Sequence, residues 1–260
     1  MTIVIAAIAV LLALAMAGAW AVQRATGNSG WVDAIWSLST GAAGVVLALA
    51  SSGPPLRRMT IAVLIAAWAL RLGGHIALRS RGAGDDPRYA DLQRQWGSNF
   101  NSRLFWFLQI QAACAFVLAC AVWLAARNPV PGLRALDILG AVLLVVSVAG
   151  EAVADAQLRA YRADPANRGG VCDRGLWAWS RHPNYFFEWL VWVGVALFAI
   201  GPDALGWLAF AAPVLMYWLL VYASGVPPLE AHMARSRPAA WAAYAARTSV
   251  FFPRPPKAAP

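Results

Sequence analysis

Long runs of hydrophobic residues follow one another along almost the whole chain, with short polar stretches between them. The runs lie near residues 2–22, 31–50, 60–78, 104–126, 134–154, 185–200 and 204–224. Each is close to the roughly 20 apolar residues that a helix needs to cross about 30 Å of hydrocarbon. The pattern therefore predicts an all-α, polytopic membrane helix bundle with about seven transmembrane helices.

The composition and the distribution of charge refine this prediction. Hydrophobic residues make up 60% of the chain and charged residues 13%, and the mean hydropathy is +0.57, as in membrane proteins. If successive loops alternate sides, 16 of the 21 basic residues fall on one side, four on the other and one inside a span. Because cytoplasmic loops carry the excess of Lys and Arg, the N-terminus is expected outside and the C-terminus in the cytoplasm.

Several classes of protein are disfavoured. The net charge of +9 follows the predicted topology and is scattered among apolar residues, so membrane lipids are expected as partners and nucleic acid is not. The three cysteines and three histidines lack metal-ligand spacing, so no metal site is expected. No glycine-rich dinucleotide or phosphate motif occurs, and no long polar linker divides the chain. Residues 1–260 are therefore interpreted as a single integral membrane domain.

Charged side chains at helical spacing mark the fifth hydrophobic run. Glu151, Asp155, Arg159 and Arg162 follow one another at intervals of four, four and three residues, which puts them on one face of a helix. Pairing within a solvated helix end could explain the two arginines. It does not explain the two acids, which lie closer to the hydrocarbon, where a charge is costly and usually marks a functional site.

The polar segment before the sixth run has the features of an anion site. Proline suits the first turn of a helix, so His182-Pro183 is expected to begin the next span with its free N–H groups toward the cytoplasm. Arg181 and Arg174 flank that helix start. A helix N-terminus with basic neighbours favours a phosphate-bearing ligand. Inside the same span Asn184 and Glu188 lie four residues apart and share a face, although Glu188 could instead form a structural hydrogen bond between helices.

Two other residues could supply a proton. Asp33 lies just inside the second span, and Tyr89 lies in the first long cytoplasmic loop. A phenol can act as an acid directly, and a carboxyl can do so if burial raises its pKa. Tyr89 could equally be an ordinary interfacial aromatic residue.

The end of the seventh run contains a further candidate. The prolines at 227 and 228 are expected to end that span, so that Glu230 lies where the helix stops and the tail folds back. A solvated surface carboxylate is the simpler interpretation of Glu230.

These motifs resemble a known family. The arrangement E-x3-D-x-Q-x3-Y, then R-G-L-W-x-W-S-R-H-P-N-Y-x2-E-x3-W, then a later Glu, Tyr and F-F-P, over residues 151–253, is similar to bacterial membrane proteins grouped with the C-terminal domain of steroid 5α-reductases. The resemblance implies an enzyme that holds NADPH in a polar cavity open to the cytoplasm and transfers hydride to an activated C=C of a lipophilic substrate. It also implies a location in the inner membrane of a bacterium.

The resemblance also assigns roles to particular residues. Residues 134–253 would form the cofactor-binding part and residues 1–103 the substrate side. The expected cofactor-binding residues are Glu151, Asp155, Arg159, Arg162, Arg174, Arg181, His182, Asn184, Tyr185, Glu188 and Glu230. Tyr89 would correspond to the catalytic tyrosine, with Asp33 as the other candidate acid. Steroid 5α-reductases carry a Gln-Glu pair in their second helix that this chain lacks, so a steroid substrate is not implied.

Two other classes of function remain open at this stage. Membrane methyltransferases that act on isoprenylcysteine or phospholipid also carry an Arg-His-Pro-x-Tyr segment at the start of a late helix, with a later Glu and Tyr, and bind S-adenosylmethionine there. The pair Asn184 and Glu188 favours the reductase. A non-catalytic carrier or assembly factor is the third class, indicated if neither cofactor binds.

Overall fold

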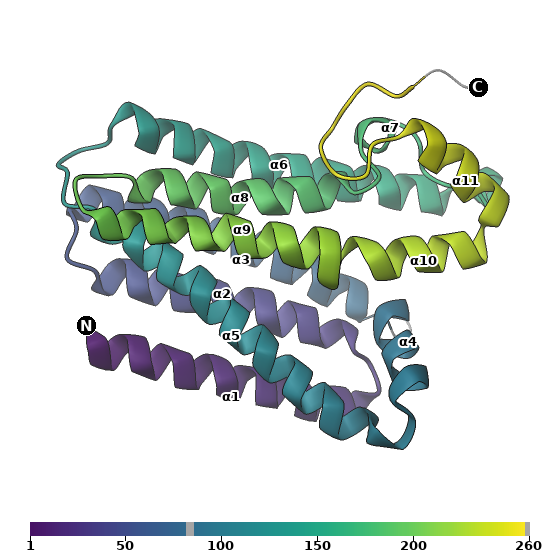
Figure 1. The fold of residues 1–260 in the computed structure, drawn as a ribbon, viewed down its shortest axis with the longest axis horizontal. Helices are drawn as coiled ribbons and strands as arrows, with labels where there is room; N and C mark the ends of the chain where they lie inside the picture. The colour runs from purple at the N-terminus through teal and green to yellow at the C-terminus, as the bar shows by residue number, and fades with distance from the viewer. Residues whose placement is uncertain (82–85, 258–260) are drawn as a thin grey trace. The chain divides into compact units, whose positions relative to one another are not determined.

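The computed structural model describes residues 1–81 and 86–257, and every regular element within these ranges is helical. The α-helices are α1 (Thr2–Thr26), α2 (Gly30–Ala50), α3 (Pro55–Ser80), α4 (Pro87–Trp96), α5 (Phe100–Arg127), α6 (Ala135–Ala163), α7 (Leu176–Trp179), α8 (Pro183–Ala199), α9 (Ala211–Trp218), α10 (Val226–Ser236) and α11 (Pro238–Arg247) (Figure 1). Short 3₁₀ turns are η1 (Gly97–Asn99), η2 (Pro165–Asn167) and η3 (Ala204–Phe210), and η4 (Leu219–Ala223) is π-helical.

The helices confirm a polytopic membrane bundle. Six helical stretches in the described part of the chain are long and apolar enough to cross a membrane. The predicted sixth span corresponds to α8, which has 17 residues and a length of about 26 Å, at the short end of what a span requires. The chain is therefore an integral membrane protein.

The end of the last span differs from the sequence prediction. The prolines at 227 and 228 do not terminate a helix; they occupy the first turn of α10, where the missing N–H of proline costs no hydrogen bond. The interruption comes earlier, at the π-helical turn η4 and the residues that follow it. Glu230 consequently lies within α10, on regular helix, rather than where the chain folds back.

Contacts between Cα atoms divide the chain into two compact units, which are described separately. Unit 1 comprises Met1–Leu144 and Trp192–Ala212, and unit 2 comprises Val145–Val191 and Pro213–Pro260. In unit 1, α1, α2 and α5 pack against one another, with α5 crossing obliquely, and α3 packs against α2 (Figure 1). A Cβ atom at Gly41 of α2 would overlap the Ala69 side chain of α3. Small residues thus let these helices approach closely, as is common where lipid provides little hydrophobic drive.

An arginine and an aspartate are fully buried together in unit 1. Two nitrogens of Arg57, in the first turn of α3, each donate to one oxygen of Asp137, in the first turn of α6, at 2.7 Å. Neither side chain has any exposed surface. Arg134 also pairs with Asp137, at 2.9 Å. Further acceptors for Arg57 are the carbonyl oxygens of Val130, Gly132 and Phe198. These contacts join α3, α6, the loop before α6 and the end of α8.

Unit 2 contains the second half of α6, the first half of α8, most of α9, and α10, α11 and the tail. A Cβ atom at Gly150 of α6 would strike the Phe187 ring of α8, so these two helix segments are in direct contact. The tail is anchored by rings: Phe251 lies 6.0 Å from Trp189 and 5.3 Å from Tyr217, measured between centroids. In unit 2 the C-terminal tail therefore packs against α8 and α9.

Candidate functional site

The turn that precedes α8 is fixed by the C-terminal part of the chain. The hydroxyl of Ser180 accepts from the backbone N–H of His182 at 3.1 Å and donates to the carbonyl oxygen of Phe251 at 2.9 Å. The hydroxyl of Tyr244, on α11, donates to the carbonyl oxygen of Trp177 at 2.7 Å. α8 then begins at Pro183, as predicted. Because its entry is held from α11 and the tail, the side chains around residue 182 have a defined direction.

Two predicted site residues converge on a third at this point. The Arg181 Nε atom lies 3.0 Å from Oε1 of Glu230, and the His182 Nε2 atom lies 3.1 Å from the same oxygen. Tyr185 stacks on the His182 ring with centroids 5.5 Å apart and planes at 8°. The Arg181 guanidinium also lies over the Trp241 ring, 5.5 Å from its centroid. We call Arg181, His182, Tyr185 and Glu230 the α8 cluster.

Burial sets the protonation chemistry of the cluster. Desolvation lowers the pKa of His182, and the positive charge of Arg181 acts in the same direction, while the hydrogen bond to Glu230 partly opposes both. The imidazole is therefore neutral at pH 7, and one ring nitrogen can donate while the other accepts. Burial also raises the pKa of Tyr244, so its phenol stays protonated and acts as a donor. The α8 cluster is consequently ready for hydrogen bonding to a ligand rather than for holding a second positive charge beside Arg181.

The polar face predicted on α6 is graded in burial. Glu151 is buried, Asp155 is half-buried, and Arg159 and Arg162 are exposed. On this face the acidic side chains are buried or half-buried, and the guanidinium groups are exposed at the C-terminal end of α6.

The same order recurs along α8, with Glu188 buried, Asn184 half-buried and Arg181 at the start of the helix. Since α6 and α8 touch at Gly150 and Phe187, two similarly graded helices lie together in unit 2.

The remaining predicted binding residue lies on the loop between α6 and α7. Arg174 is exposed, and its guanidinium lies 5.9 Å from the centroid of the Tyr161 ring. Arg168, on the same loop, is also exposed. Both belong to unit 2, so all eleven predicted cofactor-binding residues fall in one unit.

The two candidate acids meet within unit 1. The Tyr89 hydroxyl donates to Oδ1 of Asp33 at 3.3 Å, and a nitrogen of Arg88 donates to Oδ2 of the same carboxylate. Tyr89 is buried among the apolar side chains of unit 1, and Arg88 also bonds to Asp86 at the start of α4. Burial by itself would raise the pKa of Asp86, but the hydrogen bonds and charge of Arg88 outweigh it and lower that pKa. The sequence named both acids, and their direct contact comes from the tertiary structure.

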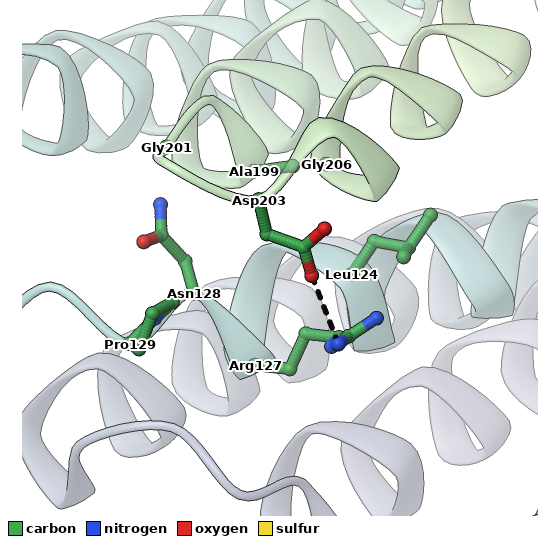
Figure 2. Close-up of a pocket in the computed structure, with 8 residues that line it drawn as sticks. All are labelled: Leu124, Arg127, Asn128, Pro129, Ala199, Gly201, Asp203 and Gly206. Atoms are coloured by element: carbon green, nitrogen blue, oxygen red, sulfur yellow. Dashed lines mark ion pairs between the residues drawn. The ribbon is translucent and has the colours of Figure 1, made fainter.

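The small cavity in Figure 2 has a structural role. It lies in unit 1, where Arg127 pairs with Asp203 at 2.9 Å and the Asn128 amide donates to the carbonyl oxygens of Phe198 and Ile200, both at 2.9 Å. Its volume is about 10 Å³, room for no more than about one water molecule. A cofactor cannot enter it.

Sequence reasoning did not identify Arg57 with Asp137, nor Ser180 and Tyr244 as supports of the turn before α8. A usable signal existed for the first pair: the topology assigns the loops before residues 57 and 137 to the same side of the membrane, and an acid in the first turn of a span needs a partner. Within residues 1–81 and 86–257 no group of three or more His, Cys, Asp or Glu side chains could hold a metal ion.

Comparison with known proteins gives a family and no more. No curated protein and no solved structure matches the chain. One protein family, described as protein of unknown function (DUF1295), matches residues 19–248, which is most of the chain and includes α2 to α11 entirely. The chain therefore belongs to this family of unknown function.

Proposed function

We propose that this protein is a membrane-embedded, NADPH-dependent reductase that transfers hydride to an activated C=C bond of a lipophilic substrate of steroid-like, isoprenoid or enoyl type. The observation that carries the proposal is the graded polarity of α6 and α8 in unit 2. On both helices a buried acid, Glu151 or Glu188, is followed toward the helix end by uncharged or half-buried groups and then by arginine. An elongated ligand with a polar uncharged end and a phosphate end matches that gradient.

The polar side chains of unit 2 include hydrogen-bond donors and acceptors that suit each part of NADPH. Exposed Arg159, Arg162 and Arg174 offer guanidinium groups for phosphates, which arginine binds in bidentate fashion. Glu151 and Glu188 offer buried acceptors for ribose hydroxyls or a carboxamide N–H. When bound, the nicotinamide supplies the hydride, and the protein contributes binding and orientation. Arg181 contacts Glu230 through Nε, and its guanidinium also supplies positive charge for the phosphate end at the start of α8.

The reduction also consumes a proton, for which Tyr89 and Asp33 are the candidates. The Tyr89 hydroxyl already directs its proton at the Asp33 carboxylate, and Arg88 orients that carboxylate from the other oxygen. Tyr89 is assigned as the donor and Asp33 as the residue that positions the phenol. Tyr89→Phe should then lower turnover while leaving NADPH affinity unchanged. Unchanged turnover would remove Tyr89 from the reaction, and Asp33→Asn would then test the second candidate.

The proposal extends to location and partners. The protein is expected in the inner membrane of a bacterium, with the cofactor site toward the cytoplasm, since 16 of 21 basic residues fall on the side assigned to α6's end and α8's start. Its partners are membrane lipids and a lipophilic substrate, not nucleic acid. A protease-accessibility assay on the C-terminal tail in spheroplasts and inverted vesicles tests this orientation.

The deciding experiment is cofactor binding to the purified protein in detergent. Wild type should bind NADPH saturably, and Asn184→Ala and Glu188→Ala should each abolish that binding while retaining a cooperative unfolding transition. Matched controls are Asn99→Ala, exposed in unit 1, and Asp173→Ala, exposed in unit 2. Both should bind as wild type does. If the controls lose binding to the same extent, the assignment of the site is wrong.

A methyltransferase is the second candidate because the contacts of the α8 cluster involve only residues common to both motifs. Arg181 and His182 meet Glu230, and Tyr244 secures the turn that precedes them. Tight binding of S-adenosylmethionine with no NADPH binding would overturn the reductase proposal in its favour. Binding of neither cofactor would favour a non-catalytic carrier.

A further inference from the structure

The phenol of Tyr89, the proposed proton donor, has a hydrogen-bonding partner besides Asp33. Its hydroxyl donates to Oδ1 of Asp33, on α2, at 3.3 Å. The side chain of Gln111, on α5, is also hydrogen-bonded to the phenol. Gln111 therefore reaches the reacting group from a helix that carries none of the residues assigned to the proposed reaction.

The direction of the bond between Gln111 and the phenol follows from the number of hydrogens. A phenol has one hydrogen to donate and lone pairs that can accept. Because the Tyr89 hydrogen is directed at Asp33, the second bond runs from the side-chain N–H of Gln111 to the phenol oxygen. When the phenol loses its proton, the bond to the Asp33 carboxylate is lost and the bond from Gln111 remains.

Packing between α2 and α5 holds Gln111 in place. The indole N–H of Trp36, three residues after Asp33 on α2, donates to the backbone carbonyl oxygen of Gln111 at 3.1 Å. Trp36 packs against the same hydrophobic cluster that contains Tyr89 and Leu108. Tyr89 is 3% exposed, so the protein rather than solvent supplies the groups around its phenol. In such an environment of low polarity a hydrogen bond is stronger than in water.

The charged groups that face Tyr89 come from α2 and from the start of α4. Asp33 and Asp86 are negative and disfavour a phenolate. The guanidinium of Arg88 lies 5.9 Å from the centroid of the Tyr89 ring and favours a phenolate. Its nitrogens, however, donate to the Asp33 and Asp86 carboxylates. A hydrogen bond donated directly to the phenol oxygen therefore has a large effect on how readily Tyr89 gives up its proton.

We propose that Gln111 is a positioning residue for proton transfer, whose amide orients the Tyr89 phenol and stabilises the phenolate left behind. This role rests on the proposed reductase function. In that reaction the phenol O–H bond breaks, its proton goes to the substrate anion formed by hydride addition, and its electron pair stays on the phenol oxygen. Water then returns a proton to the phenolate. The Gln111 amide donates to the oxygen throughout and transfers no proton itself.

The test is a titration of this one phenol in the full-length protein in detergent. A ring-fluorinated tyrosine at position 89 is more acidic than tyrosine and reports its own ionisation by ¹⁹F NMR. Gln111→Met keeps nearly the volume of glutamine but has no N–H, so it should make the phenol at least about ten-fold less acidic, the effect of one hydrogen bond to a charged group. Gln111→Glu, which when ionised accepts but cannot donate, should have an effect at least as large.

Gln109→Met is the matched control. Gln109 lies two residues away on α5, and its side-chain amide donates to the carbonyl oxygen of Ala13 at 3.4 Å rather than to the phenol. This variant should leave the acidity of the phenol unchanged. Unchanged acidity in the Gln111 variants would overturn the role of Gln111, and so would an equal loss of acidity in Gln109→Met. The two Gln111 variants are independent, so the test stands if one of them does not fold.

NADPH binding by the same samples separates this role from the function on which it rests. Absence of NADPH binding by the wild type would overturn the proposed reductase and, with it, the role of Gln111 in reduction. Normal NADPH binding with unchanged acidity in the Gln111 variants would overturn the role of Gln111 alone. Normal NADPH binding with a less acidic phenol in those variants, and an unaffected Gln109→Met control, is the result expected.

Discussion

The Arg57–Asp137 pair of unit 1 and the α8 cluster of unit 2 use the same chemistry for different ends. Arg57 and Asp137 are both fully buried and share two hydrogen bonds of 2.7 Å, with Arg134 as a further partner of Asp137. In the α8 cluster, Glu230 is 23% exposed and shares a single oxygen between Arg181 and His182. The fully buried Arg57–Asp137 pair joins helices. The partly exposed Glu230 carboxylate, with two partners on one oxygen, can instead rearrange around a ligand. Exposure, rather than the presence of charge, separates a structural ion pair from a candidate site.

Arg57→Leu should be the most damaging change. It leaves the Asp137 carboxylate buried with Arg134 as its remaining cation, so the free energy of unfolding should fall by about 3–5 kcal/mol. Denaturant unfolding in detergent, followed by circular dichroism, measures this. The double change Arg57→Leu with Asp137→Leu should recover part of the loss, because it removes the uncompensated charge. A double variant less stable than the single one would contradict the attribution of the loss to an uncompensated Asp137 charge.

Glu230→Gln should have a smaller effect on stability. The amide keeps an acceptor but loses the charge that draws Arg181 and His182 together, which costs about 1–2 kcal/mol. The same unfolding assay applies, with Asp173→Asn as the control, since that exposed carboxylate meets Arg247 only at 3.4 Å. If Glu230→Gln destabilises the protein as much as Arg57→Leu does, the α8 cluster is as structural as the Arg57–Asp137 pair, and exposure does not distinguish them.

Tyr244→Phe should cost about 1 kcal/mol, the contribution of a hydrogen bond from a buried hydroxyl. The lost donor frees the carbonyl oxygen of Trp177 and loosens the turn before α8. Tyr222→Phe is the matched control, because Tyr222 is largely exposed. Equal stability of Tyr244→Phe and wild type would show that α11 does not support the α8 cluster.

The smallest expected effect is a dependence of stability on pH. The pKa of His182 is lower in the folded protein than the usual 6.5, so the unfolded state binds the proton first as the pH falls. Stability should therefore be full above about pH 6.5 and decline as the pH falls toward the folded pKa. Melting temperatures between pH 8 and pH 5 should decline less in His182→Gln than in wild type or His232→Gln. Parallel profiles for all three would refute the buried, neutral imidazole.

Much of the fold follows from local sequence. The hydrophobic runs predict the spans because the length of an apolar run and the thickness of the bilayer are fixed by the same geometry. Pro183 predicts the start of α8 because proline suits a first helical turn. The same rule holds at the prolines 227 and 228, which begin α10 and do not end the preceding span as the sequence predicts. A proline marks a boundary, but its sequence context does not say whether a helix ends before it or starts at it.

Some features of the candidate site likewise follow from local sequence, and others depend on the tertiary structure. The sequence by itself determined the all-helical membrane fold and the spacing that sets Glu151 with Asp155, and Asn184 with Glu188, on common helix faces, because helical periodicity is a property of neighbours in the chain. Only the tertiary structure decided that Arg57 meets Asp137, 80 residues away, and that His182 meets Glu230, 48 residues away. Which charges pair depends on the packing of distant helices, and that packing also involves close contacts between small residues and rings that are far apart in the chain.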